Sequence, residues 1–145
     1  MVNEIRAVVS ELGGERTLGR ELSNEGDLRQ AIREGFPPAV VANLMAASGL
    51  TLKEVAGALD LSPRSLQRRR RTGRLAPFES DRLYRLARIL AIATEFLGNA
   101  ERAQRWLKRP NHALGDIAPL AAIDTEPGAR QVENLLGRIA YGGIS

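Results

Sequence analysis

Residues 51–75 read TLKEVAGALDLSPRSLQRRRRTGRL, and this stretch predicts two short helices joined by a tight turn. Thr51 and Glu54 have the spacing of a capping box, in which each side chain satisfies a backbone N–H group of the first helical turn. Apolar residues then recur at helical spacing and predict one buried stripe, formed by Leu52, Val55, Ala56 and Leu59.

The second helix of this stretch is predicted to begin at Ser62, an N-cap residue, with Pro63 at the first helical position. Leu66 faces inward, and Gly73 is placed to end the helix. The outward face carries polar side chains spaced i, i+3, i+4 and i+7, namely Arg64, Gln67, Arg68 and Arg71. This pattern is typical of a helix-turn-helix, whose second helix lies in a DNA major groove.

A generic helical hairpin with a solvated arginine face is the alternative interpretation of the same residues. The turn of a helix-turn-helix usually carries Gly, and Asp60 takes that place here. Asp tolerates the left-handed conformation better than most residues do, so the departure weakens the assignment without excluding it. The capping box, the Ser-Pro restart and the charge distribution favour DNA binding.

Positive charge is concentrated in this one segment. Residues 64–74 contain six arginines, and no acidic residue lies between Asp60 and Glu79. The rest of the chain holds 15 of the 21 basic residues against 17 acidic ones, so the formal net charge of +4 originates in this segment. A clustered basic patch on an otherwise balanced chain indicates a nucleic-acid partner.

The basic side chains divide into two predicted roles on DNA. Arginine pairs with guanine edges and Gln with adenine, so the candidates for base contacts are Arg64, Ser65, Gln67 and Arg68. Phosphate contacts position a protein without reading sequence, and the candidates for these are Arg69, Arg71 and Arg74.

Composition indicates an all-α protein. The 145 residues are 43% hydrophobic and only 4% aromatic, and the apolar residues recur at helical spacings. The length fits one domain, or two small ones that share a core. There is no cysteine, and neither a signal peptide nor a stretch of about 20 apolar residues is recognisable, so we expect a cytoplasmic protein.

The residues offer no catalytic site. The 17 carboxylates are scattered, and the single histidine, His112, has no second His or Cys with which to share a metal. The segment from Gly14 to Glu21 resembles a phosphate-binding loop but lacks its Lys-Ser/Thr pair. We therefore expect neither an enzyme nor a bound metal or cofactor.

Three regions are expected along the chain. Residues 1–22 form an N-terminal arm, loosely attached, with one short amphipathic helix; residues 23–75 form the helix-turn-helix domain; residues 76–145 form a second helical domain. This second domain opens with a helix over residues 77–97 that is apolar on more than one face and must be covered on several sides. We expect a second copy of the chain to supply part of that cover, giving a dimer.

The second half of the chain carries motifs that resemble a known family. They include Arg105-Trp106-Leu107, Pro110-Asn111, Leu114-Gly115, Thr125-Glu126-Pro127-Gly128-Ala129-Arg130 and Leu135-Leu136-Gly137-Arg138-Ile139, followed by Tyr141-Gly142. Together they closely resemble the C-terminal domain of Xre-type antitoxins, the partners of RES-domain toxins, with relatives named MbcA and ParS. The resemblance extends to Leu66-Gln67-Arg68-Arg69 and Glu79-Ser80-Asp81-Arg82-Leu83, and covers roughly residues 25–142.

This resemblance implies a function. Such antitoxins silence a cognate toxin that consumes NAD, and they repress their own operon by binding its operator. The hypothesis places Arg130, Arg138, Tyr141, Gly142 and Gly143 in or over the active site of the toxin. On physical grounds alone, the alternative interpretation of the C-terminal Tyr-Gly-Gly segment is a frayed terminus that does not contact the toxin. The alternative for the whole chain is a stand-alone helix-turn-helix regulator whose second half only dimerises.

The chain departs from the family pattern at three places. His112 stands where relatives often carry Pro or Arg, and Asp116-Ile117 replaces a Gly-Arg pair. These differences leave the loop conformation and the toxin contacts around residues 111–118 open. Arg70 stands where relatives tend to have Leu, and we expect its stem to lie over the core while its charged head reaches outward.

Overall fold

The computed structural model describes residues 4–142, and every regular element in this range is helical, which confirms the predicted all-α class. The elements are α1 (Glu4–Glu11), α2 (Gly14–Leu18), α3 (Glu25–Glu34), α4 (Ala39–Ser48), α5 (Leu52–Ala58), α6 (Pro63–Arg69), α7 (Pro77–Leu97), α8 (Ala100–Lys108), a 3₁₀ turn (His112–Leu114), α9 (Pro119–Ala122) and α10 (Glu126–Tyr141). No single helix among them is long and apolar enough to span a membrane; the bent pair of α4 and α5 passes that test by length and composition only.

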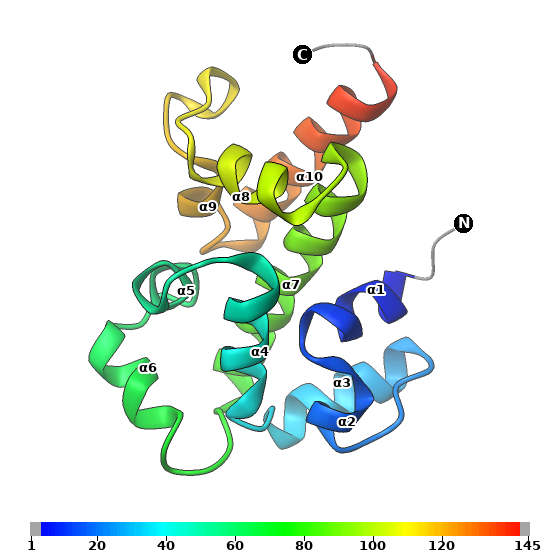
Figure 1. Cartoon of the computed structure of the whole chain (residues 1–145), viewed down its shortest axis with the longest axis vertical. Coiled ribbons are helices and arrows are strands. Elements are labelled where there is room, and N and C mark those ends of the chain that lie inside the picture. The colour runs from blue at the N-terminus through cyan, green and yellow to red at the C-terminus, as the bar shows by residue number, and fades with distance from the viewer. Residues whose placement is uncertain (1–3, 143–145) are drawn as a thin grey trace.

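The long helix α7 runs through the middle of the molecule (Figure 1). Helices α2 to α6 lie around its lower part, α1 packs alongside it, and α8, α9 and α10 gather around its upper part. Its buried apolar residues belong to one continuous core that reaches into both halves of the chain: Leu83, Leu86, Ala87, Ile89, Leu90 and Ala93. The expectation that this helix needs cover on several sides is met within one chain, by α1, α3, α8 and α10.

The N-terminal region is not the loosely attached arm that the sequence analysis expected. Helix α1 packs on α7, and Val8 and Leu12 retain only 1% and 0% of their exposed surface. Leu18 and Leu22, which follow, are also buried. The amphipathic pattern of residues 5–12 was visible in the sequence, but its partner surface on α7 is some 80 residues away along the chain. Helix α1 therefore supplies cover that we had expected from a second copy.

The predicted local signals of the helix-turn-helix are present. Thr51 and Glu54 form the capping box, with Thr51 N–H donating to Glu54 Oε1 at 2.8 Å and Glu54 N–H donating to Thr51 Oγ1 at 3.1 Å. Asp60 occupies the turn in the left-handed conformation with φ of 55°. Ser62 caps α6 by accepting a hydrogen bond from the Ser65 N–H group at 3.0 Å.

Helix α6 ends at Arg69, four residues before the predicted terminator Gly73. Beyond Arg70 the backbone hydrogen bonds shorten to i−3, as in Arg71 N–H to Arg68 O at 3.0 Å. The chain must then turn back, because the Leu75 N–H group bonds to Phe36 O at 2.9 Å, close to where α3 ends. Gly73, with φ of 114°, lies within this turn and does not cap the helix.

Side-chain caps begin two helices of the second half. Asn99 caps α8 and Thr125 caps α10, each through its side-chain oxygen. Apolar residues recur at helical spacing on α10, and two of them, Val132 and Leu136, are fully buried. The neighbouring apolar residues Leu135 and Ile139 are half-buried.

Candidate functional site

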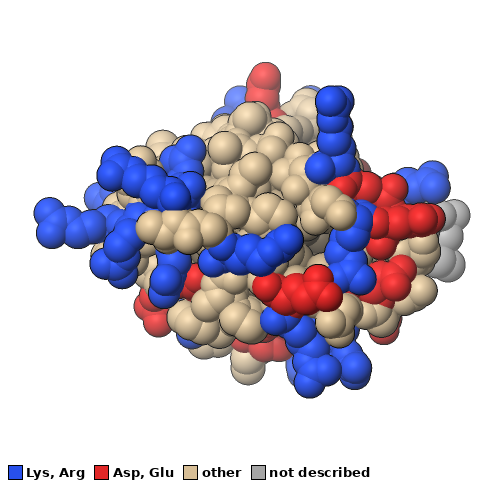
Figure 2. Space-filling model, turned by 90° about the horizontal axis from the view of Figure 1, so that it is seen from below, with Lys and Arg blue, Asp and Glu red and all other residues tan. Residues whose placement is uncertain are grey.

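Helix α6 presents its arginines to solvent at one end of the molecule. Arg64 and Arg68 are exposed on the helix, and Arg71 is exposed in the turn that follows it. In the view from below, blue side chains gather on the left of the face, the side on which α6 lies in Figure 1, whereas red and blue side chains alternate on the right (Figure 2). These three guanidinium groups are thus accessible to a phosphate backbone or to base edges.

The two uncharged candidates for base contacts are less exposed than the arginines. Ser65 is half-buried, and its hydroxyl lies 2.9 Å from the Ser62 hydroxyl within the helix cap. Gln67 is also half-buried, and its carbonyl oxygen accepts a hydrogen bond from Arg70 Nη1 at 3.2 Å. Because the carbonyl oxygen is occupied, the amide nitrogen of Gln67 remains available as a donor. A role of Ser65 or Gln67 in contacting bases stays a prediction.

Two arginines predicted to contact phosphate have hydrogen-bond partners within the protein, although Arg74 is exposed and the Arg69 side chain retains 39% of its exposed surface. Arg69 Nε donates to Glu79 Oε2 at 3.0 Å, and Glu79 is 1% exposed. Arg74 Nη1 donates to the Gly35 carbonyl at 2.7 Å, across the turn that connects α6 to α7. The spacing of the arginines does not distinguish Arg69 and Arg74 from Arg71, because the partners of Arg69 and Arg74 lie on other parts of the chain.

The predicted residues on α10 fall into two places. Tyr141 is 82% exposed, and its ring packs edge-on against Phe96 of α7 with 5.5 Å between ring centres. Arg138 and Gly142 line the same shallow hollow as Tyr141. Arg130 lies about two helical turns earlier, with Nε 3.8 Å from Glu126. Gly143 lies outside the described residues.

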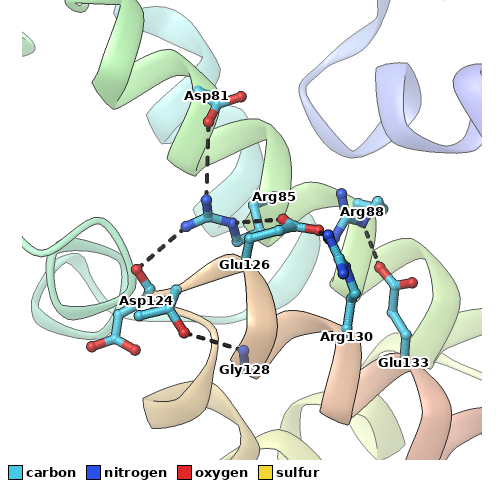
Figure 3. A network of polar contacts seen from close by, with 9 residues as sticks. Asp81, Arg85, Arg88, Asp124, Glu126, Gly128, Arg130 and Glu133 are labelled. Carbon is cyan, nitrogen blue, oxygen red and sulfur yellow. Dashed lines mark hydrogen bonds and ion pairs between the residues drawn. The ribbon is translucent and has the colours of Figure 1, made fainter.

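A polar network that the sequence did not predict joins α7 to α10 (Figure 3). Arg88 Nε bonds Glu133 Oε1 at 2.5 Å, and Arg88 Nη2 bonds Glu126 Oε2 at 3.1 Å. Arg85 Nε bonds Glu126 Oε1 at 3.2 Å. These arginines precede their partners by about 40 residues, so no local pattern reveals the pairing. The network fixes α10 against α7, on which α5 of the helix-turn-helix also packs.

The network shifts the acidity of its members. Burial by itself would raise the pKa of Glu126, but the charge of Arg88 and hydrogen bonds from Arg88 and Arg85 outweigh it, so that pKa lies below its usual value. Burial would likewise lower the pKa of Arg88, yet the Glu133 carboxylate raises it above the ordinary value for arginine. Both groups are therefore charged at neutral pH, as the ion pairs require.

No three His, Asp or Glu side chains within residues 4–142 are grouped in a way that could hold a metal ion. His112 is 99% exposed, and its Nδ1 lies 3.3 Å from Asp116. Asp116 itself has a left-handed backbone with φ of 68°, within the loop that the Asn111–Ile117 bridge closes.

Comparison with known families assigns the two halves separately. Residues 27–88 match the family model described as the antitoxin Xre-like helix-turn-helix domain. Residues 93–142 match the antitoxin Xre/MbcA/ParS C-terminal toxin-binding domain. The first match ends and the second begins within α7, so this helix contributes to both domains.

Similar proteins match over most of their length. Antitoxin Xre of Photorhabdus laumondii is 33% identical over 132 residues, which cover 90% of this chain and 89% of that protein. Antitoxin Xre of Yersinia enterocolitica is also 33% identical with the same coverage, and that of Pseudomonas putida is 34% identical over 123 residues, 84% of this chain and 76% of that protein.

Fold, arginine face and family matches define a helix-turn-helix protein with a C-terminal toxin-binding domain, and neither domain type is an enzyme. The chain belongs to the Xre antitoxin family.

Proposed function

We propose that the protein neutralises a cognate toxin through its C-terminal domain and represses its own operon by binding operator DNA as a homodimer. The observation that carries this proposal is the separation of two exposed surfaces: the arginines of α6 lie at one end of the molecule, and the C-terminal end of α10 lies at the other (Figure 1). One chain therefore offers a DNA-binding surface and a protein-binding surface that do not compete for space.

The toxin partner is proposed to be a RES-domain protein that consumes NAD, and the antitoxin to act by covering its active site in the cytoplasm. The resemblance of the motifs in residues 105–142 to antitoxins that partner RES-domain toxins supports this choice. Arg138 and the exposed Tyr141 lie together at the end of α10, so an arginine and an aromatic ring project from one site. Such a pair suits a pocket built for a nucleotide, and the antitoxin itself needs no cofactor.

The proposal of a homodimer is supported by the usual geometry of helix-turn-helix recognition, in which two recognition helices meet successive turns of the groove. Helix α7 remains a candidate contributor, because Ala91, Ile92 and Phe96 are only half-buried and line a hollow of about 360 Å³ between α1 and α10. This dimer is proposed to form part of a larger toxin–antitoxin complex.

Arg71→Ala is expected to weaken binding to all DNA sequences alike, because Arg71 is proposed to meet a phosphate. The slope of log affinity against log salt concentration should fall by about one unit. Gln67→Ala is the matched variant: it should relax sequence preference and leave the slope unchanged. Mobility-shift titrations on the DNA upstream of the gene measure both quantities, and a wild-type protein with no salt-sensitive complex would rule out the operator function.

Trimming the chain after Ile139 should release the activity of the toxin while operator binding survives, because Tyr141 is exposed and the recognition helix lies at the far end. The measurement is growth of cells that express the toxin with either the full or the trimmed antitoxin, together with a mobility shift of the trimmed protein. Full neutralisation by the trimmed chain would show that the tail is dispensable.

A stand-alone transcription regulator is the second candidate, and α6 supports it equally well. The two are separated by expressing the protein with the product of the adjacent gene. An antitoxin should co-purify with that product as a stable complex, whereas a stand-alone regulator should emerge by itself.

A further inference from the structure

Two buried polar side chains stand in the first turn of α7. Glu79 and Ser80 are 1% and 0% exposed. Glu79 Oε1 accepts a hydrogen bond from the Ala76 N–H group at 2.7 Å, which caps the helix, and its Oε2 accepts one from Arg69 Nε at 3.0 Å. Ser80 Oγ accepts from the Phe36 N–H group at 2.8 Å. A buried carboxylate without a charged partner is costly, so Glu79 needs Arg69.

Helix α6 has few other anchors. It is only seven residues long, and Leu66 is its one fully buried residue. One fully buried side chain constrains the direction of a short helix only weakly. Arg69, at the last position of the helix, adds a second point of attachment, since its Nε is bonded to the interior of the protein. Two points one turn apart define the direction of the helix axis.

The start of α7 also bonds to α5, the first helix of the helix-turn-helix. Arg82 Nη1 donates to the Leu59 carbonyl at 2.9 Å, at the C-terminal end of α5. Both helices of the helix-turn-helix are therefore bonded to the first two turns of α7, one through Glu79 and one through Arg82. Base contacts require side chains to be held within about 0.5 Å, so such anchoring bears directly on sequence recognition.

We propose that Arg69 and Glu79 form a positioning pair that sets the orientation of the recognition helix, and that Arg69 does not contact phosphate. The inference rests on the proposed DNA binding by α6. It replaces the earlier assignment of Arg69 as a phosphate contact. A positioning role and a phosphate contact predict different results. Breaking the pair should reduce sequence preference, and it should leave the salt dependence of DNA binding unchanged because no phosphate contact is lost.

Two single variants separate the alternatives. Glu79→Gln changes a residue that is buried and out of reach of DNA. The variant removes the charge of the ion pair, and one of the two hydrogen bonds is lost because the amide nitrogen must face either the Ala76 or the Arg69 donor. Arg69→Gln removes the charge but keeps a donor at the ε position, where Arg69 makes its bond. Arg71→Ala serves as the comparator for a phosphate contact. In the double variant Arg69→Gln/Glu79→Gln, the two amides can bond each other while the Ala76 N–H group keeps its acceptor.

The experiment measures affinity for the DNA upstream of the gene and for an equally long coding fragment, over a series of salt concentrations. We expect Glu79→Gln to reduce the ratio of the two affinities by about 10-fold, the order of one lost base contact. The double variant should restore that ratio. All three variants should keep the wild-type salt slope, whereas Arg71→Ala should lower it by about one unit.

The opposite pattern overturns the proposal: a slope lowered by about one unit in Arg69→Gln, with an unchanged ratio in Glu79→Gln, would make Arg69 a phosphate contact. Helix content and melting temperature are recorded for each variant. If Glu79→Gln is unfolded at the assay temperature, the slope of Arg69→Gln decides. Absence of salt-sensitive binding by the wild type would instead refute the proposed operator function.

Discussion

Gly128→Ala is expected to lower the melting temperature of the protein by roughly 10 °C, corresponding to about 3 kcal/mol of unfolding free energy. Gly128 lies in the first turn of α10 and is buried against the end of α9. An added Cβ would fall on the carbonyl oxygen of Ala122, and it would lie 3.1 Å from Thr125 Oγ1, which caps α10. Backbone cannot yield as the end of a side chain does, so α9 and α10 must separate.

Gly137→Ala is the matched control, because it makes the same substitution in the same helix. A Cβ at Gly137 meets no atom within 4 Å apart from its chain neighbours and the backbone of its own helix. Replacing a glycine inside a helix where there is room should stabilise the protein by about 0.5–1 kcal/mol. Thermal unfolding followed by circular dichroism compares the two variants. A Gly128→Ala protein as stable as the Gly137→Ala protein would mean that α9 does not pack as described.

Deleting residues 1–22 is expected to abolish cooperative folding, which is the second large effect. Within residues 4–22, which the structure describes, the deletion removes five buried apolar side chains: Val8, Val9, Leu12, Leu18 and Leu22. Each contributes on the order of 1.5–3 kcal/mol, so their sum is comparable with the entire stability of about 5–15 kcal/mol of a typical domain. The loss also exposes the side of α7 that α1 covers.

A point substitution tests the same packing with the chain intact. Leu12→Ala, at a residue with 0% exposure, should cost about 2–5 kcal/mol. Arg16→Ala, on the exposed surface of α2, should change stability by less than about 0.5 kcal/mol. Urea titration gives both values. If the shortened chain unfolded with the wild-type midpoint, the N-terminal region would be the loose arm that the sequence suggested.

The placement of the binding residues was only partly predictable. The exposure of Arg64 and Arg68 followed from helical periodicity, because Leu66 marks the inward side of a short helix. The environments of Arg69 and Arg74 did not, since their partners Glu79 and Gly35 belong to other elements. A run of arginines looks uniform in sequence, and only the surrounding fold distinguishes a side chain that anchors a helix from one that is available to DNA.

The sequence by itself determined where most helices begin, which turn joins α5 to α6, and which family the chain resembles. Most of those features depend on contacts within one helical turn, such as Thr51 with Glu54 or Ser62 with Ser65. Such contacts can be predicted from the spacing of the residues in the sequence. Tertiary structure alone decided that α1 covers α7, that α6 stops before Gly73, and that Arg88 pairs with Glu133. These depend on segments far apart in the chain, whose meeting is set by the packing of the whole core.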